Sequence, residues 1–294
     1  MLLGLLILLP LLLCCPWGPG HHLEFAVRVL RRRKERLPAA TAKLLHEHRD
    51  AYLYGSLAAD LITFKNFGGA YSHCHRWGIL EDMREHAHTD RGEAFILGYL
   101  SHLAADTIAH NHFVPYHLAR YARTKGLGHL YWEMNADRFI PEERWELVTE
   151  LKGDKRLAAL DEIVNRCVPK KALSMGTNKL LFNHVLLVSE RERWRKGMAS
   201  IHPMHNVKLE RGFLRLFQEA AVERIFLGLH ARGLQELMRV DANGKDAQEQ
   251  AMQTRASLIE RWTSGPERSE ESEERAAVFL EGMQSPPPTL RSGR

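Results

Sequence analysis

Strand signals are scarce in this chain of 294 residues. It contains no run of alternating valine, isoleucine and threonine bounded by turn residues. Apolar residues at helical spacing instead recur along most of its length, and no internal repeat is present. We therefore predict an all-α protein, a multi-helix bundle. The expected helices span 22–36, 39–48, 76–88, 90–111, 129–138, 142–151, 156–166, 178–198, 207–239 and 244–262.

Cysteine is also rare, with only Cys14, Cys15, Cys74 and Cys167. The first two lie in an apolar N-terminal segment, so a chain without that segment has at most one disulfide. A disulfide-rich scaffold is thereby excluded. Cys74 lies between two histidines and could be a metal ligand, but we favour the interpretation that it is a small buried apolar residue.

The N-terminal segment 1–16, MLLGLLILLPLLLCCP, contains no charged residue. It is short for a membrane span and has the length of the apolar region of a signal peptide. We predict an export signal and a periplasmic or extracellular protein, although no lysine or arginine precedes the leucines and no Ala-x-Ala-like site precedes Trp17. An uncleaved membrane anchor and lipid modification at Cys14 or Cys15 are the alternatives.

Charge is mildly basic and distributed, with a net charge of +5 and a pI of about 9.0. This argues only weakly for anionic partners. The basic run Arg31–Arg36 (RRRKER) could contact anionic lipid at a membrane surface, but we favour a solvated helix face. Residues 264–294 are charged and proline-rich, so we predict a disordered tail with one short helix over Arg275–Met283.

Histidine, by contrast, is abundant: nine of the 17 lie between His73 and His129. In the stretch YLSHLAADTIAHNHF (99–113), His102, Asp106 and His110 are spaced four apart, which places them on one face of a helix. Their neighbours are apolar, and a buried carboxylate is costly unless a cation meets it. Imidazole and carboxylate are both zinc ligands, so this ridge predicts a metal site.

Further ligand candidates precede and follow this ridge. Each has an ordinary structural explanation, as a helix cap, a surface histidine or a solvated pair. Their joint occurrence in one helical half of the chain favours a shared site. The candidates are His22 in WGPGHHL, Asp60 in YLYGSLAADL, His73 and His75 in YSHCHRW, and the i, i+4 pair His129 and Glu133 in GHLYWEMNAD.

These motifs resemble those of the bacterial zinc-dependent phospholipase C family, whose trinuclear zinc plan is shared by the S1/P1 nucleases. The stretches that carry the resemblance lie within roughly residues 17–140. The resemblance implies an all-α bundle of the phospholipase C/P1 nuclease type, with two to three zinc ions in a cleft. The matching stretches are WGPGHHL, GSLAADL, SHCHRW, GYLSHLAADTIAHNHFVP and GHLYWE.

The resemblance also implies a ligand set with several alternatives. His75 could replace His73, and the histidine after Asp106 is His110, which fits helix geometry better, or His112. The third site requires cleavage directly before Trp17. The implied sites are Asp60, His73, His102 and Asp106 for the first zinc; His110 or His112 with His129 and Glu133 for the second; and His22, a bridging Asp106 and the amino and carbonyl groups of Trp17 for the third.

The activity that the resemblance implies is hydrolysis of a phosphodiester in phospholipid head groups. Zinc-activated water would attack phosphorus in line, with Asp60 as ligand and candidate general base. Carboxylates such as Asp82, Glu85 and Asp90 are candidates to hold the second nitrogen of a ligand histidine. A histidine–aspartate phosphohydrolase is disfavoured because the sequence has no adjacent His-Asp pair.

Two other functions stay open. A nuclease or nucleotidase on the same metal plan would need an aromatic pocket to stack a nucleic-acid base, which Trp77, Tyr131 or Trp132 could supply. A non-catalytic, membrane-associated zinc protein is the second alternative, although structural zinc sites are usually rich in thiolate. In either case we expect a metal-binding core over 17–140 and a helical remainder of the same domain over 141–263.

Overall fold

The computed structural model of the protein describes residues 17–61, 73–121, 135–167, 209–261 and 266–283, together with Trp132, Met175 and Thr177. Within these ranges the secondary structure is helical and no strand occurs, which confirms the all-α prediction. None of the helices in this part of the chain is long and apolar enough to cross a membrane. The predicted helix at 178–198 and half of that at 129–138 lie outside the described residues.

Three helices open the fold: α2 (Pro19–Arg36), α3 (Ala39–Glu47) and α4 (Arg49–Ala58). α2 starts with proline at its first position, where the missing N–H costs no hydrogen bond. α4 was not predicted. Its residues from Ala51 to Ala58 are all buried, so it lacks the polar face that gives a surface helix its recognisable period.

The central element is α6 (Asp90–Ile108), which contains the predicted ridge. Thr89 caps it, because its side-chain oxygen accepts a hydrogen bond from the backbone N–H of Gly92. α6 crosses α4 at close range: a Cβ atom added to Gly98 would lie 2.1 Å from the carbonyl oxygen of Tyr52. The small residues at this crossing let α4 deliver the segment that follows it to the middle of α6.

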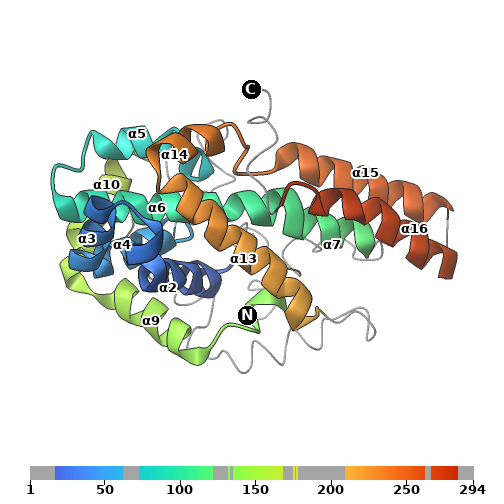
Figure 1. Ribbon diagram of the computed structural model, residues 1–294, viewed down its shortest axis with the longest axis horizontal. Coiled ribbons are helices and arrows are strands. Elements are labelled where there is room, and N and C mark those ends of the chain that lie inside the picture. Colours follow the sequence, from blue (N-terminus) through green and yellow to red (C-terminus); the bar gives the residue numbers. More distant parts are fainter. Residues whose placement is uncertain are drawn as a thin grey trace.

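The predicted helix 90–111 does not keep one geometry to its end. After Ile108 the chain continues as a π-helix, η3 (Ala109–Phe113), and then as α7 (Val114–Arg120) (Figure 1). Pro115 lies in the first turn of α7 and has no N–H for an α-helical hydrogen bond to Asn111. A wider turn before the proline accommodates this missing donor.

The remaining helices complete one continuous core, which contains buried residues from both halves of the chain. The predicted helix 207–239 is divided at His230, which precedes α14 and lies between two helices. In Figure 1, α13 crosses α6, while α15 and α16 lie beside α7 at one end of the molecule. The bounds are α5 (Ile79–Arg84), α9 (Glu142–Gly153), α10 (Ala158–Cys167), α13 (Arg211–Gly228), α14 (Ala231–Leu237), α15 (Lys245–Arg261), α16 (Pro266–Ala277), and the 3-10 turns η2 (His73–His75), η4 (Lys155–Leu157) and η6 (Val278–Leu280).

The structure differs from the predicted disorder after residue 263 at α16, whereas η6 falls within the short helix predicted over Arg275–Met283. Arg268, Ser272 and Ala276 are buried at a spacing of four, and Phe279 continues the buried side. Arg120 of α7 donates hydrogen bonds to this face, including one of 2.8 Å to Ser272 Oγ. These few buried residues are hard to recognise in a charged, proline-rich sequence, because most residues of α16 still face solvent.

Candidate metal centre

Five buried side chains from four parts of the chain converge beside the middle of α6. Their exposed fractions are between 0% and 5%. α6 contributes two of them, and α2, the segment after α4, and η2 contribute one each. The five are His22, Asp60, His75, His102 and Asp106.

His22, His102 and Asp106 form the first group of potential ligands, with their donor atoms all within 4.8 Å of one another. His22 Nε2 lies 3.4 Å from Asp106 Oδ1, and His102 Nε2 lies 3.2 Å from Asp106 Oδ2. The His22 and His102 rings stack with their centroids 3.7 Å apart. The first turn of α2 is thereby held directly against the middle of α6.

Asp60, His75 and His102 form the second group, again with donor atoms within 4.8 Å. Asp60 Oδ1 lies 3.6 Å from His102 Nε2 and 3.9 Å from His75 Nε2. His75 Nε2 is also 3.6 Å from Asp106 Oδ2. Asp106 therefore turns one oxygen toward His22 and the other toward His75 and His102, an arrangement suited to a bridging carboxylate.

The second ring nitrogen of His102 determines its tautomer. His102 Nδ1–H donates a hydrogen bond of 3.0 Å to the carbonyl oxygen of Ser56 in α4. Because a carbonyl only accepts, Nδ1 carries the proton and Nε2 presents its lone pair to the carboxylates. The second nitrogen of His102 is thus held by a backbone carbonyl of α4, a helix that was not predicted. The sequence had offered Asp82, Glu85 and Asp90 for this contact.

Burial and neighbouring charges hold these groups in metal-binding protonation states. Burial, assisted by the adjacent His102, lowers the pKa of His22. Burial alone would raise the pKa of Asp106, but His102 and His22 hold it well below its usual range. A neutral His22 imidazole beside an ionised Asp106 carboxylate is a combination that binds a divalent cation without first releasing protons.

The site also contains polar atoms that no described residue satisfies. Both carboxylate oxygens of Asp106 and Nε2 of His22 are buried and have no hydrogen bond of good geometry within the described part of the chain. An ionised carboxylate in this condition costs several kcal/mol. A divalent cation would meet it, and a donor set of imidazole and carboxylate without thiolate fits zinc.

The later histidines behave differently from the predicted ridge. His110 is buried, and its Nδ1 lies 3.0 Å from Gln248 Nε2 of α15. His112 Nδ1–H donates to the carbonyl oxygen of Phe279 at 2.8 Å, and burial lowers the pKa of His112 to about 4. Neither belongs to the two groups found among the described donors. The π-helix starts between Asp106 and His110, which ends the i, i+4 register of the ridge.

Three predicted ligands cannot be placed in either group. His129 and Glu133 lie outside the described residues, and for His73 only the backbone position at the start of η2 is described. Their assignment as ligands stays a prediction. His75, which the sequence offered as the alternative to His73, does reach both aspartates.

Trp17 is fully buried next to this centre. Its indole Nε1–H donates to the carbonyl oxygen of Ala105, the residue before Asp106, at 3.2 Å. The ring also stacks on Phe113 with a centroid separation of 4.9 Å. These contacts anchor the chain beside α6 as it enters α2. Zinc ligation by the amino and carbonyl groups of Trp17 stays a prediction.

Sequence reasoning missed His21, the neighbour of His22. His21 Nδ1 lies 2.6 Å from Asp137 Oδ1, and its Nε2 accepts a hydrogen bond of 3.0 Å from Gln218 Nε2. The two adjacent histidines thus make different contacts. His22 faces the candidate ligands, and His21 joins α2 to α13 and to Asp137. The doubled histidine in WGPGHHL was the only available signal, and it does not say which ring faces which way.

Comparison with known proteins gives one match. A family described as zinc-dependent phospholipase C matches residues 21–175, slightly more than half of the chain, and this range contains all five convergent residues. No curated protein matches the chain, and neither does any solved structure.

Proposed function

Because the chain belongs to the zinc-dependent phospholipase C family, we propose that it is a zinc-dependent hydrolase that cleaves the phosphodiester of phospholipid head groups. The observation that carries the proposal is the position of Asp106, whose Oδ1 faces His22 while its Oδ2 faces His75 and His102. One carboxylate with potential ligands on both sides is what a site for adjacent metal ions requires. We propose two to three zinc ions per chain.

When bound, zinc lowers the pKa of a coordinated water and stabilises negative charge on phosphate oxygens. Asp106 would hold zinc through its carboxylate from a buried position in the middle of α6. His102 would be locked as a ligand by its hydrogen bond to Ser56. Asp60, which lies 3.6 Å from His102 Nε2, is the proposed general base and would take the proton of the attacking water at a carboxylate oxygen.

The remaining predicted ligands complete the proposal. His129 and Glu133, with His110 or His112, would hold a second ion, and Trp17 would contribute to a third beside His22. Either histidine would have to reach this ion from a segment already joined to α15 or to Phe279. We also propose that the protein is exported, with segment 1–16 as signal or anchor.

Packing argues against the nuclease alternative. A base-stacking platform needs an accessible aromatic face. Trp77 is only 8% exposed, and its Nε1–H donates to the carbonyl oxygen of Val240. Trp132 is fully buried, with Tyr121 stacked against it at 4.9 Å. Both indoles pack in the interior of the protein, and Tyr131 lies outside the described residues.

The test combines metal content with hydrolysis. Elemental mass spectrometry of the purified protein should find two to three zinc ions per chain, and phosphatidylcholine should yield phosphocholine and diacylglycerol. Asp246→Asn, an exposed aspartate on α15, is the matched control for Asp106→Asn. A zinc-loaded protein that cleaves single-stranded nucleic acid but no phospholipid would support the nuclease alternative. The absence of stoichiometric metal would overturn both enzymes.

A further inference from the structure

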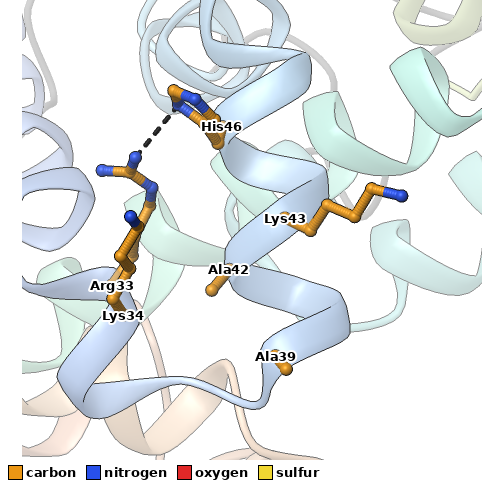
Figure 2. A pocket seen from close by; sticks show the side chains of 6 residues that line it. All are labelled: Arg33, Lys34, Ala39, Ala42, Lys43 and His46. Carbon is orange, nitrogen blue, oxygen red and sulfur yellow. Dashed lines mark hydrogen bonds between the residues drawn. The ribbon is translucent and has the colours of Figure 1, made fainter.

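A groove with a cationic rim lies between the end of α2 and the facing side of α3 (Figure 2). It is separate from the metal centre: Arg33 follows His22 by eleven positions on α2, roughly 16 Å along the helix axis. The groove is lined by Arg33, Lys34, Ala39, Ala42, Lys43 and His46.

The net positive charge of the protein is concentrated in the sequence segment that forms this groove. Residues 31–49 contain seven lysines or arginines and two glutamates, a formal excess of five, which equals that of the whole chain. Part of this charge is neutralised away from the groove, since Arg32 and Arg36 both pair with Glu223 of α13. Of the cations that line the groove, Lys43 makes a long, exposed pair of 3.9 Å with Glu47, whereas no carboxylate of the described chain pairs with Arg33 or Lys34.

Arg33 is already held in a binding orientation. One of its terminal nitrogens donates to the carbonyl oxygen of Leu30, and another lies 3.0 Å from His46 Nδ1 (Figure 2). Its Nε is buried and has no hydrogen-bond acceptor among the described residues. Since Nε is buried, an anion in the groove would meet the terminal nitrogens of this guanidinium, and phosphate oxygens make charge-assisted hydrogen bonds with such groups.

The floor of the groove is apolar. Ala39 and Ala42 contribute methyl groups, and lysine side chains add aliphatic stems whose ammonium groups reach water. An apolar floor below a cationic rim fits an amphiphilic anion better than a fully hydrated ion. We propose that this groove binds the head group of an anionic phospholipid and docks the protein on a negatively charged membrane surface.

The proposal is tested by sedimentation with vesicles of phosphatidylcholine, prepared with and without phosphatidylglycerol. The full chain is compared with the double variant Lys34→Gln/Lys43→Gln. The control is Lys245→Gln/Arg261→Gln, which removes the same charge from α15; α3 and α15 lie at opposite ends of the molecule (Figure 1). All four side chains belong to exposed residues, so both variants should keep the wild-type melting temperature.

The readout is the ratio of binding to the two kinds of vesicle. An uncharged leucine run in segment 1–16 would bind both alike and cancel in this ratio. Each lysine near an anionic surface contributes about 1 kcal/mol, so the groove variant should lower the ratio by roughly 10- to 30-fold while the control keeps it. Equal losses in the two variants, or no wild-type preference for anionic vesicles, would overturn the proposal. Binding is measured without hydrolysis, so a failed phospholipase assay leaves this result readable.

Discussion

His102 is the residue shared by both groups of candidate ligands, and Asp106 turns one oxygen toward His22 and the other toward His75 and His102. Asp106 lies in the most buried part of α6, and the described side chains that face its carboxylate are His22, His75 and His102. A metal-free chain therefore keeps an expensive ionised group in its interior. The buried carboxylate of Asp106 is suited to metal binding and costs some stability in the metal-free protein.

Replacing Asp106 with asparagine should separate these two effects. Without zinc, the two proteins should differ little in melting temperature, because the variant loses both the cost of burying the charge and the attraction of that charge to His102 and His22. The wild type should gain stability on zinc addition, whereas the variant should gain little, and hydrolysis should fall at least about 100-fold. Calorimetry with and without zinc measures both, and Asp246→Asn should resemble the wild type. A variant that binds zinc fully would refute the bridging role.

His117 makes a separate prediction about acid. It is buried against Phe113 and Trp132, and burial lowers its pKa to about 3, with its Nδ1–H donated to the carbonyl oxygen of Phe113. Its unfolded pKa is near 6.5. Between these two pKa values the unfolded chain therefore binds a proton at His117 that the folded chain does not bind. The unfolding free energy falls as pH drops from about 6.5 toward 3, by up to about 1.4 kcal/mol per pH unit.

The variant His117→Asn keeps a donor but removes this proton. Urea unfolding between pH 7 and pH 4 should show a shallower loss of stability than the wild type, whatever the cost of the lost ring at neutral pH. His88→Asn, at an exposed histidine, should leave the slope unchanged. If His117→Asn has the wild-type slope, His117 is already protonated in the folded protein.

At the scale of elements, the site depends on how closely α4 meets α6. Gly55 and Gly98 face backbone across this crossing: an added Cβ would lie 2.0 Å from the carbonyl oxygen of Phe95 or 2.1 Å from that of Tyr52. The same crossing brings the Ser56 carbonyl to His102 and the end of α4 to Asp106. Helix packing and ligand placement therefore share one cause.

Gly98→Ala should push α4 away from α6. We expect a loss of about 3 kcal/mol in unfolding free energy, at the upper end for overpacking because the obstacle is backbone. Zinc affinity should fall as well, since Asp60 moves with α4. Gly153→Ala is the control: it lies at the end of α9 with open space around it and should be neutral or slightly stabilising. Unchanged urea midpoints in both variants would contradict this packing.

At the scale of the whole molecule, the C-terminal segment belongs to the folded body. α16 packs on α7, and Phe279 and Met283 are 4% and 5% exposed. η6 receives the hydrogen bond of His112. The end of the chain thus supports the segment that directly continues α6.

Truncation tests this support. Removing residues 264–294 should lower unfolding free energy by several kcal/mol, since each buried large apolar side chain contributes about 1.5–3 kcal/mol. Removing only 284–294 keeps Phe279 and Met283 and is the matched comparison. Thermal melts of the two truncated chains should differ clearly. Equal melting temperatures would mean that α16 and η6 add nothing to the fold.

The sequence by itself determined the fold class and the donor chemistry. Helical periodicity without strand signals is a local property, and so is the spacing of His102 and Asp106 on one face of a helix. The cost of burying Asp106 among apolar neighbours was equally readable, which is why a metal site could be predicted.

Only the tertiary structure decided which side chains share the site. His22, Asp60 and His75 reach α6 from other segments, and no spacing rule connects residues so far apart in the chain. The choice of His22 over His21 as a partner of Asp106 depends on how α2 is rotated by Trp17 and Asp137. The break in the ridge before His110 likewise follows from a π-helix. The spacing of apolar residues in the sequence does not reveal the hydrogen-bond pattern of such a helix.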